Sequence, residues 1–439
     1  MTKILFITVG GSHPPVVTSI NTLQPDRIIF ICSDDTDTSR GSKSQIIGQD
    51  KPCEVRNKDG SIERFPNIPT MLGLGERFQE DRDLVLIKDP DDLSECYRKI
   101  SDCVLNIKKD ITNAEIMADY TGSTKTMSVG LAMVAMDYQI LMYVTSTSRK
   151  NLIRVEEGEL TEKASTTPVV VERIIKQLIP IFLKEYNYQA AISQLKHPLQ
   201  SMELQPDLKR HIRDLHTYCN AFDAWDRFDH RTAWARLQPY MKQPNIQPYG
   251  LFLKKVIASR GQLDIGFDNS DGVSGHGYEV VEDLLLNADR RASQQRYDDA
   301  VGRLYRAIEL LEQIRLFKNY GILTGDVDVL KLPESLQAEY EKMRSSRNHK
   351  IMISLFQSYE LLSKLGEDPL GKLFVLHRGE IQNSLEVRNN SLLAHGFEPV
   401  NESRYRSFYS VIGSFIQEGI TSVISSKSKS SSLQFPQSL

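Results

Sequence analysis

The first 165 residues of the chain alternate short apolar runs with segments of helical character. The runs that predict buried strands are Ile4–Val9, Arg27–Ile31, Leu84–Ile87, Ile116–Asp119 and Ile140–Thr145. Strands that alternate with helices favour a parallel, doubly wound sheet. The sequence therefore predicts an α/β, Rossmann-like N-terminal domain. Ligands of such sheets bind beyond the carboxyl ends of the strands.

The rest of the chain has helical character almost throughout and predicts an all-α C-terminal region. The glycine-rich stretch Gly261–Gly277 predicts a long loop, and Tyr297–Lys318 has apolar residues at helical spacing. Ala164–Pro168 marks the change in composition and is the expected linker. We therefore expect a Rossmann-like domain (1–165), a helical connector (169–276), a second helical domain (277–425) and a Ser-rich, disordered tail (426–439).

Composition limits the class of protein. Of the 439 residues, 40% are hydrophobic and 25% are charged, which is typical of a soluble globular protein. The formal net charge is -3, so any nucleic-acid site must be a local patch. None of the five cysteines forms a CxxC pair, which predicts no zinc or redox motif and fits a reducing cytoplasm. The apolar run at the N-terminus ends at Gly10, too early for a signal peptide or a membrane span.

The first motif that suggests chemistry is Asp119–Thr126, where a predicted strand leads into a predicted helix. Gly122 permits an unusual turn, and backbone N–H groups and outward hydroxyls at a helix N-terminus form an anion site. Lys125 adds a charge suited to phosphate. The motif lacks the P-loop pattern, and a Ser/Thr-capped helix start explains the same residues equally well. The glycines of Gly10–Pro15, after the first strand, also allow a ligand to approach the backbone.

The second motif is Glu386–Gly396, which contains Arg388 and His395. At about 100° per residue their spacing is close to two helical turns, so one continuous helix would place both on one face and end at Gly396. A histidine transfers protons near neutral pH, and an arginine holds a phosphate and stabilises its pentavalent state. From spacing alone, an ordinary cationic helix end is the favoured interpretation.

Taken together, the motifs resemble those of CRISPR-associated ribonucleases that join a CARF domain (CRISPR-associated Rossmann fold) to a HEPN domain. Asp119–Lys125 resembles the CARF ligand motif, and Gly10-Gly11-Ser12 resembles the second ligand loop of such domains. Arg388-Asn389 followed by Ala394-His395-Gly396 resembles the HEPN catalytic signature, and 297–309 resembles a HEPN helix. The order of the motifs makes the resemblance more specific than any one of them, although 170–276 matches nothing in the pattern.

The resemblance implies a homodimer that acts in type III CRISPR antiviral defence, linked functionally to the CRISPR complex without stable binding. Its paired CARF domains would bind a cyclic oligoadenylate, because a ring of repeating phosphates matches the two-fold symmetry of a dimer. The expected ring is the tetra-adenylate. The implied ligand residues are Gly10, Gly11, Ser12, Thr121, Gly122, Ser123, Thr124 and Lys125.

Binding of this activator would switch on the paired HEPN domains, which cut single-stranded RNA without a metal ion and leave a 2′,3′-cyclic phosphate. By the same resemblance His395 would be the acid or base, Arg388 would contact the phosphate and the transition state, and Asn389 would orient or support them. No cluster of His, Asp or Glu with clear metal-ligand spacing lies near Arg388, so the sequence assigns no metal site.

Two other interpretations stay open. In the first, the chain is a sensor whose HEPN-like domain binds RNA or a partner without catalysis, although the intact pair Arg388 and His395 argues against it. In the second, the chain is a ring nuclease whose main reaction degrades the cyclic oligoadenylate, with Thr124 or Lys125 in its site.

Overall fold

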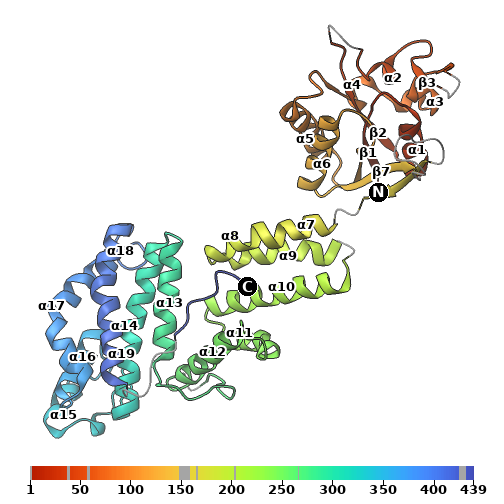
Figure 1. The fold of residues 1–439 in the computed structure, drawn as a ribbon. Coiled ribbons are helices and arrows are strands. Elements are labelled where there is room, and N and C mark those ends of the chain that lie inside the picture. The colour runs from red at the N-terminus through yellow and green to blue at the C-terminus, as the bar shows by residue number, and fades with distance from the viewer. Residues whose placement is uncertain are drawn as a thin grey trace. The chain divides into compact units, whose positions relative to one another are not determined.

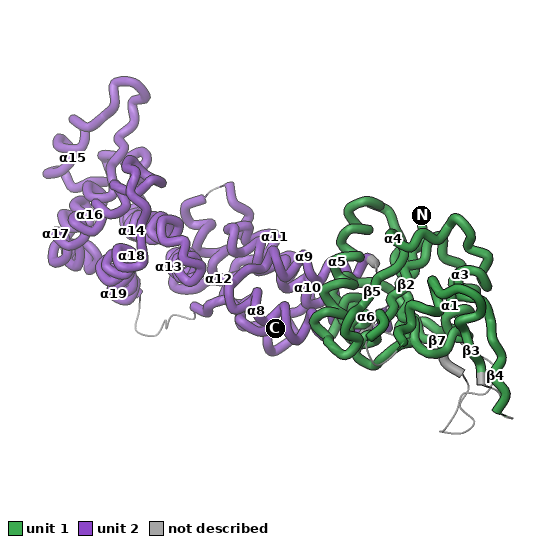
Figure 2. The backbone as a smooth tube through the Cα atoms, turned by 90° about the horizontal axis from the view of Figure 1, so that it is seen from above, with its two compact units in different colours: residues 1–172 green, residues 173–439 purple. Residues whose placement is uncertain are grey.

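The computed structural model divides the chain into two compact units, Met1–Glu172 and Arg173–Leu439 (Figures 1 and 2). The residues that the structure describes are 2–36, 40–56, 60–147, 159–164, 167–201, 204–264, 266–424 and 432–439. Part of the predicted linker, residues 165 and 166, lies outside them. The predicted connector and second helical domain share one unit, and the boundary between them stays a prediction.

The first unit is built on a six-stranded sheet in the order β5-β2-β1-β6-β7-β8. All neighbouring strands are parallel except β7 and β8, which are antiparallel. The bounds of the strands are β1 (Thr2–Thr8), β2 (Arg27–Ser33), β5 (Leu84–Ile87), β6 (Ala114–Asp119), β7 (Leu141–Thr147) and β8 (Glu159–Lys163). The predicted Rossmann-like fold is thus confirmed, with an unpredicted edge strand, β8.

Helices cover both faces of this sheet, because alternate residues of β1 enter different cores. Ile4 and Phe6 pack with α5 and α6, whereas Leu5 and Ile7 pack with α1. The bounds of these helices are α1 (Pro14–Leu23), α5 (Leu93–Asp110) and α6 (Lys125–Asp137). The sequence did not predict the short elements between β2 and β5, which are α2 (Ser44–Ile47), β3 (Cys53–Arg56), β4 (Ile62–Phe65), α3 (Ile68–Met71), the turn Gly75–Arg77 and α4 (Glu80–Asp83).

The second unit consists of helices and loops, with no sheet among its described residues (Figure 1). Its first helices are α8 (Ile179–Lys184), α9 (Tyr188–Ser201), α10 (Pro206–Asp226), α11 (His230–Leu237) and α12 (Gln247–Arg260), and α7 (Thr167–Arg173) precedes them across the division between the units. The described residues between Arg260 and Glu279 contain neither helix nor strand, which confirms the predicted loop.

The later helices surround α14, which packs against α13, α16, α17, α18 and α19. Gly321 ends α14 with a φ of 67°, a left-handed conformation that glycine adopts without strain. Asp368 caps α17 by accepting hydrogen bonds from the backbone nitrogens of Leu370 and Gly371. The bounds are α13 (Glu279–Ser293), α14 (Tyr297–Tyr320), α15 (Glu334–Glu341), α16 (Leu355–Lys364), α17 (Pro369–Asn389), α18 (Glu402–Phe408) and α19 (Ser414–Val423).

The end of the chain differs from the predicted disordered tail where the structure describes it, at residues 432–439. Phe435 is 3% exposed, and its ring lies 4.9 Å from that of Trp225 and 3.7 Å from the Arg290 guanidinium. The Tyr188 hydroxyl donates to the carbonyl of Pro436, at 3.4 Å. The Ser-rich composition did not predict this contact, because the contact depends mainly on one aromatic side chain. Within the described parts of the chain, no helix combines the length and apolar character needed to cross a membrane.

We predict that Phe435→Ala destabilises the helical unit by about 3–5 kcal/mol, the usual cost of emptying a buried aromatic site. Denaturant unfolding followed by tryptophan fluorescence measures the loss, because Trp225 contacts the deleted ring. Ser438→Ala, at an exposed position of the same segment, is the control and should leave the free energy of unfolding unchanged. Equal stability of the two variants would show that the terminal segment does not hold this unit together.

Candidate functional site

The two loops that the sequence placed at the carboxyl ends of strands touch each other in the structure. A Cβ atom on Gly10 would collide with the backbone nitrogen of Ser123, and one on Gly122 would lie 2.9 Å from the carbonyl oxygen of Thr8. Glycine is therefore required at both positions by close approach of backbone to backbone. Ser123 has a φ of 102°, a conformation that costs a non-glycine residue energy and is concentrated at functional sites.

A buried carboxylate fixes the start of the second loop. Asp119 ends β6 and is fully buried. It accepts hydrogen bonds from the hydroxyls of Ser19 (2.6 Å) and Thr145 (3.1 Å), and from the backbone nitrogen (2.8 Å) and hydroxyl of Thr121. Asp119 is the first residue of the predicted motif, but no role was predicted for it. Its position as the last residue of a strand, before a loop of hydroxyls, was the available signal.

The sequence predicted that the hydroxyls of this loop face outward, but they bond to other groups of the protein instead. Thr124 caps α6 by accepting from the backbone nitrogen of Met127, at 3.2 Å, and its hydroxyl donates to the carbonyl of Pro90, at 2.8 Å. The hydroxyl of Thr121 accepts from the backbone nitrogen of Thr145, at 2.6 Å, besides its bond to Asp119. These hydroxyls shape the loop because buried polar groups must find partners.

The remaining groups of the site are accessible. Lys125 is the exposed first residue of α6 and makes no ion pair or side-chain hydrogen bond within the described residues. Gly11 and Ser12 are exposed in the neighbouring loop. The backbone N–H groups of the first turn of α6 lie beside them and carry the positive end of the helix dipole. Backbone N–H groups, Lys125 and the exposed Ser12, rather than the hydroxyls of Thr121 and Thr124, are therefore the groups available to an anion.

Two polar side chains beside the Gly10 loop were missed by the sequence analysis. Gln45 is 7% exposed and donates from its amide nitrogen to the carbonyl oxygen of Gly10, while its own oxygen has no partner in the described chain. His13 is 6% exposed, and its Nδ1 has no partner there either. Burial lowers the pKa of His13, which favours a neutral ring. Nothing in the sequence marks Gln45, because it belongs to a short helix with no motif.

The second motif is arranged differently from its prediction, because α17 ends at Asn389 and does not reach His395. The residues that follow form a turn in which the backbone nitrogen of His395 donates to the carbonyl of Asn389, at 3.2 Å. Gly396 closes the turn, and a Cβ atom there would collide with the carbonyl oxygen of Asn390. Arg388 and His395 thus do not share a helix face. Short polar side chains at Asn389, Asn390 and Ser391 compete for the backbone and favour this early end.

The backbone hydrogen bond nevertheless keeps His395 at the end of the helix that carries Arg388. The Arg388 guanidinium lies 4.3 Å from the centre of the Tyr305 ring on α14, and its Nη1 donates to the side-chain oxygen of Asn389, at 3.3 Å. Arg388 is half-buried, whereas Asn389 and His395 are exposed. The stacking fixes the arginine and leaves the histidine accessible.

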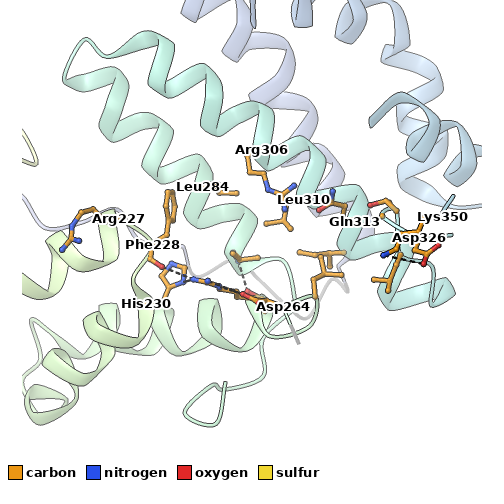
Figure 3. Close-up of a pocket in the computed structure, with 18 residues that line it drawn as sticks. Arg227, Phe228, His230, Asp264, Leu284, Arg306, Leu310, Gln313, Asp326 and Lys350 are labelled. Atoms are coloured by element: carbon orange, nitrogen blue, oxygen red, sulfur yellow. Dashed lines mark hydrogen bonds and ion pairs between the residues drawn. The ribbon is translucent and has the colours of Figure 1, made fainter. Parts of the chain in front are cut away.

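A separate cavity of about 990 Å³ lies in the helical unit, lined by residues of α11 to α14 and the loop after α14 (Figure 3). Its cations already have carboxylate partners: Arg227 pairs with Asp223 at 2.8 Å, Arg260 with Asp264 at 3.3 Å, Arg306 with Glu309 at 3.3 Å and Lys350 with Asp326 at 4.0 Å. None of the residues of the two motifs lines it. Among the described residues, no three His, Cys, Asp or Glu side chains gather in a way that could hold a metal ion.

Comparison with known proteins assigns the class of the helical unit. Residues 272–418 match the family model described as the Csm6 HEPN domain, and they contain Arg388, Asn389 and His395. This part of the helical unit is therefore similar to the Csm6 HEPN domain. No curated protein sequence matches the chain.

The fold of the whole chain is similar to that of a solved structure. It is similar to Csm6 of Enterococcus italicus, whose structure was solved bound to cyclic hexa-2′-fluoro-hexa-dAMP, with a TM-score of 0.58 and 13% identity. The match covers 96% of this chain and 94% of that one. Residues 272–418 are thus similar to the Csm6 HEPN domain, and the order of an α/β unit before a helical unit is as in Csm6.

We predict that Gly10→Ala separates the two loops of the first unit, whereas Gly11→Ala does not, because nothing lies within 4 Å of a Cβ atom on Gly11. Overpacking of this kind costs about 1–3 kcal/mol. Hydrogen exchange measures the effect locally: amides of residues 119–128 should exchange faster in Gly10→Ala only. Identical exchange in both variants would mean that the loops are not held together by this contact.

Proposed function

We propose that this protein is an endoribonuclease that cuts single-stranded RNA without a metal ion and is activated by a cyclic oligoadenylate in type III CRISPR antiviral defence. The observation that carries the proposal is the position of His395, which is hydrogen-bonded through its backbone to the helix end that presents Arg388, inside a HEPN domain of the Csm6 type. The cyclic oligoadenylate links the protein functionally to the type III CRISPR complex, and the protein and the complex do not bind each other stably.

The proposed chemistry needs a group that moves protons and a group that holds the phosphate. His395 is exposed and takes the proton of the ribose 2′-hydroxyl or gives one to the leaving 5′-oxygen. The 2′-oxygen attacks the adjacent phosphorus, the bond to the 5′-oxygen breaks, and a 2′,3′-cyclic phosphate remains. Arg388 stabilises the charge of the pentavalent state, and Asn389 holds the arginine through its side-chain oxygen.

The proposed activator site is the pair of touching loops in the first unit. The exposed Gly11 and Ser12, the start of α6 and Lys125 offer backbone N–H groups and one free charge to a phosphate. Thr121, Gly122, Ser123 and Thr124 form the turn that presents them. The Gln45 oxygen and the His13 nitrogen, which have no hydrogen-bond partner among the described residues, suit a polar ligand such as an adenine ring. The tetra-adenylate remains our prediction, and the six-membered ring analogue bound by the Enterococcus italicus protein makes the hexa-adenylate the ring to test beside it.

The proposed active unit is a homodimer. The turn that carries His395 also exposes three large apolar side chains, with Leu392 64%, Leu393 62% and Phe397 87% exposed. Apolar side chains gathered on one exposed turn are typical of a surface that another molecule covers. A second copy related by a two-fold axis would cover them and bring a second Arg388 and His395 to the same phosphate.

The test is cleavage of labelled single-stranded RNA with and without cyclic tetra-adenylate and hexa-adenylate, repeated in EDTA. We expect cleavage that needs one of the rings and survives EDTA. Labelled messenger in the same reactions separates the other interpretations: loss of the ring without RNA cleavage indicates a ring nuclease, and binding of both molecules without any cleavage indicates a sensor. Activity that EDTA removes and a divalent ion restores would contradict the metal-independent mechanism.

We predict that His395→Ala lowers the rate of RNA cleavage by about 10²–10⁴-fold, the usual value of general acid–base catalysis, and leaves activator binding unchanged. His211→Ala, at an exposed position on α10, is the control. Mixing His395→Ala with wild-type chain should lower activity more than dilution does, because mixed dimers hold an incomplete site. Activity in strict proportion to the wild-type fraction would contradict a shared site.

We predict that Lys125→Ala weakens activator binding about 10-fold or more, as expected for a lost hydrogen bond between charged groups. Lys109→Ala is the control, because Lys109 lies in the last turn of α5, away from the carboxyl ends of the strands. Calorimetry gives the affinity, and an RNA cleavage titration should show a higher activator requirement with full activity at saturation. Wild-type affinity in Lys125→Ala would place the activator elsewhere.

A further inference from the structure

A second cavity of the helical unit, of about 660 Å³, opens where α13 ends and α14 begins. Residues of α18 and of the π-helical turn Tyr409–Gly413 form its other wall. Turns of this kind are rare and occur often at functional sites. Its lining includes Asp289, Tyr297, Tyr405, Arg406 and Tyr409, none of which belongs to the motifs described above.

The cavity lies close to the HEPN motif along the chain and in space. The backbone nitrogen of Glu398 donates to the carbonyl of Asn390, at the end of α17, and the backbone nitrogen of Val400 donates to Asp298 on α14, each at 3.1 Å. Glu402, four residues after Glu398, already lines the cavity. Four residues span at most ~14 Å, so a short stretch of extended single-stranded RNA can reach from the motif to the cavity.

The walls of the cavity offer aromatic faces. The rings of Tyr297 and Tyr405 lie 5.6 Å apart, and those of Tyr405 and Tyr409 lie 5.9 Å apart. Tyr405 is buried, whereas Tyr297 and Tyr409 are half-buried and keep part of their surface toward the cavity. Base stacking on such rings is the common way in which proteins hold single-stranded RNA.

Asp289 gives the cavity a free hydrogen-bond acceptor. It is half-buried and makes no ion pair or side-chain hydrogen bond within the described residues. A carboxylate has two oxygens that accept side by side. On its Watson–Crick edge guanine presents two neighbouring donors, N1–H and the exocyclic amino group. Adenine and cytosine present one donor next to an acceptor, and uracil presents one donor between two acceptors. Guanine is therefore the base whose edge matches one carboxylate.

We propose that this cavity binds a guanine base of single-stranded RNA, with Asp289 accepting from N1–H and the amino group while the tyrosines stack on the ring. The proposal deepens the proposed function, since it names a base preference for the RNA that the HEPN motif cuts. Arg406, exposed beside the cavity and paired with Glu402 at 2.6 Å, can meet the phosphate that follows the base.

The acceptor must be ionised, which gives the site a pH dependence. Burial raises the pKa of Asp289 to about 6, although the neighbouring Arg290 opposes the shift. The other titratable or charged groups that line the cavity are Tyr297, Tyr405 and Tyr409, and Arg406 with its partner Glu402. Preference for guanine should therefore increase as the pH rises through 6, because the protonated acid keeps only one good acceptor.

The experiment measures binding in a chain that cannot cut, His395→Ala, by fluorescence anisotropy with uridine oligonucleotides that hold one guanine, inosine or adenine. Binding is measured with and without the activator. Two hydrogen bonds to one base discriminate by about 1–3 kcal/mol, so we expect guanine to bind ~10-fold more tightly than adenine. Inosine, which lacks the amino group, should fall between them.

Two added substitutions separate the roles within the cavity. Asp289→Asn should remove the preference for guanine and its pH dependence, whereas Tyr297→Leu should weaken all three oligonucleotides about 10-fold without changing their order. Asp207→Asn makes the same change as Asp289→Asn at a side chain that is 95% exposed, and should change nothing. Asp289→Asn should not lower Tm above pH 6, because the raised pKa means that the charge of this carboxyl opposes folding there.

The outcomes distinguish this proposal from the proposed function. Equal binding of guanine and adenine, or a preference that survives Asp289→Asn, overturns the guanine site even if the wild-type chain cuts RNA. A preference that Asp289→Asn removes supports the site even if the wild-type chain cuts nothing, in which case the nuclease proposal alone is lost. A change of oligomeric state in Asp289→Asn, measured by sedimentation, would instead assign the cavity to a second copy of the chain and overturn the proposal.

Discussion

The packing of one helix, α14, is the constraint on which the proposed RNA site depends. The ring of Tyr305 supports the Arg388 guanidinium, the Asp298 carboxylate holds the backbone of Val400, and Tyr297 forms a wall of the second cavity. All three contacts come from the N-terminal part of a helix whose other faces are buried by α13, α16 and α19. Because α14 cannot shift without disturbing that core, the loop with His395 and the proposed base site keep a fixed spacing. Precise spacing is what catalysis of phosphodiester cleavage requires, since misplacement by about 1 Å can cost 10²-fold in rate.

In the first unit, a buried carboxylate, rather than a buried helix, holds the candidate site in a fixed arrangement. Asp119 gathers the hydroxyls of Ser19, Thr121 and Thr145 at the carboxyl end of β6, and the loop that follows is strained at Ser123. The strain is held by contact with Gly10, so the loop is formed before any ligand arrives. A preformed site binds tightly but does not by itself regulate anything. Activation requires that the ligand bind the active arrangement of the protein better than the inactive one, and only that difference in affinity shifts the population.

The sequence predicted the elements that follow from periodicity and missed those that depend on single contacts. Five strands were found from their short apolar runs, and the long helix α14 was found from apolar residues at helical spacing. The two loops were identified because each follows a predicted strand and contains glycines, but their contact with each other was not predicted. The early end of α17 was missed, since the spacing of Arg388 and His395 fits a helix and only local competition by Asn and Ser side chains breaks it. The burial of Phe435 and the role of Gln45 were out of reach, because each depends on a partner distant in sequence.

Charge explains why such a protein would recognise bases and not only phosphates. The net charge is -3, and many arginines of the helical unit, among them Arg227, Arg260, Arg315 and Arg406, are paired with carboxylates. With a slightly acidic net charge, the nonspecific, electrostatic part of the affinity for RNA should be smaller than in a strongly basic protein. Stacking and hydrogen bonds to bases have to supply the rest, and both depend little on salt. An RNA site built from Tyr297, Asp289 and a single stacked Arg388 is the kind of site that this charge balance permits. In the proposed function, such a site would keep the protein from binding every RNA around it, so that cleavage would depend on the activator rather than on the concentration of RNA.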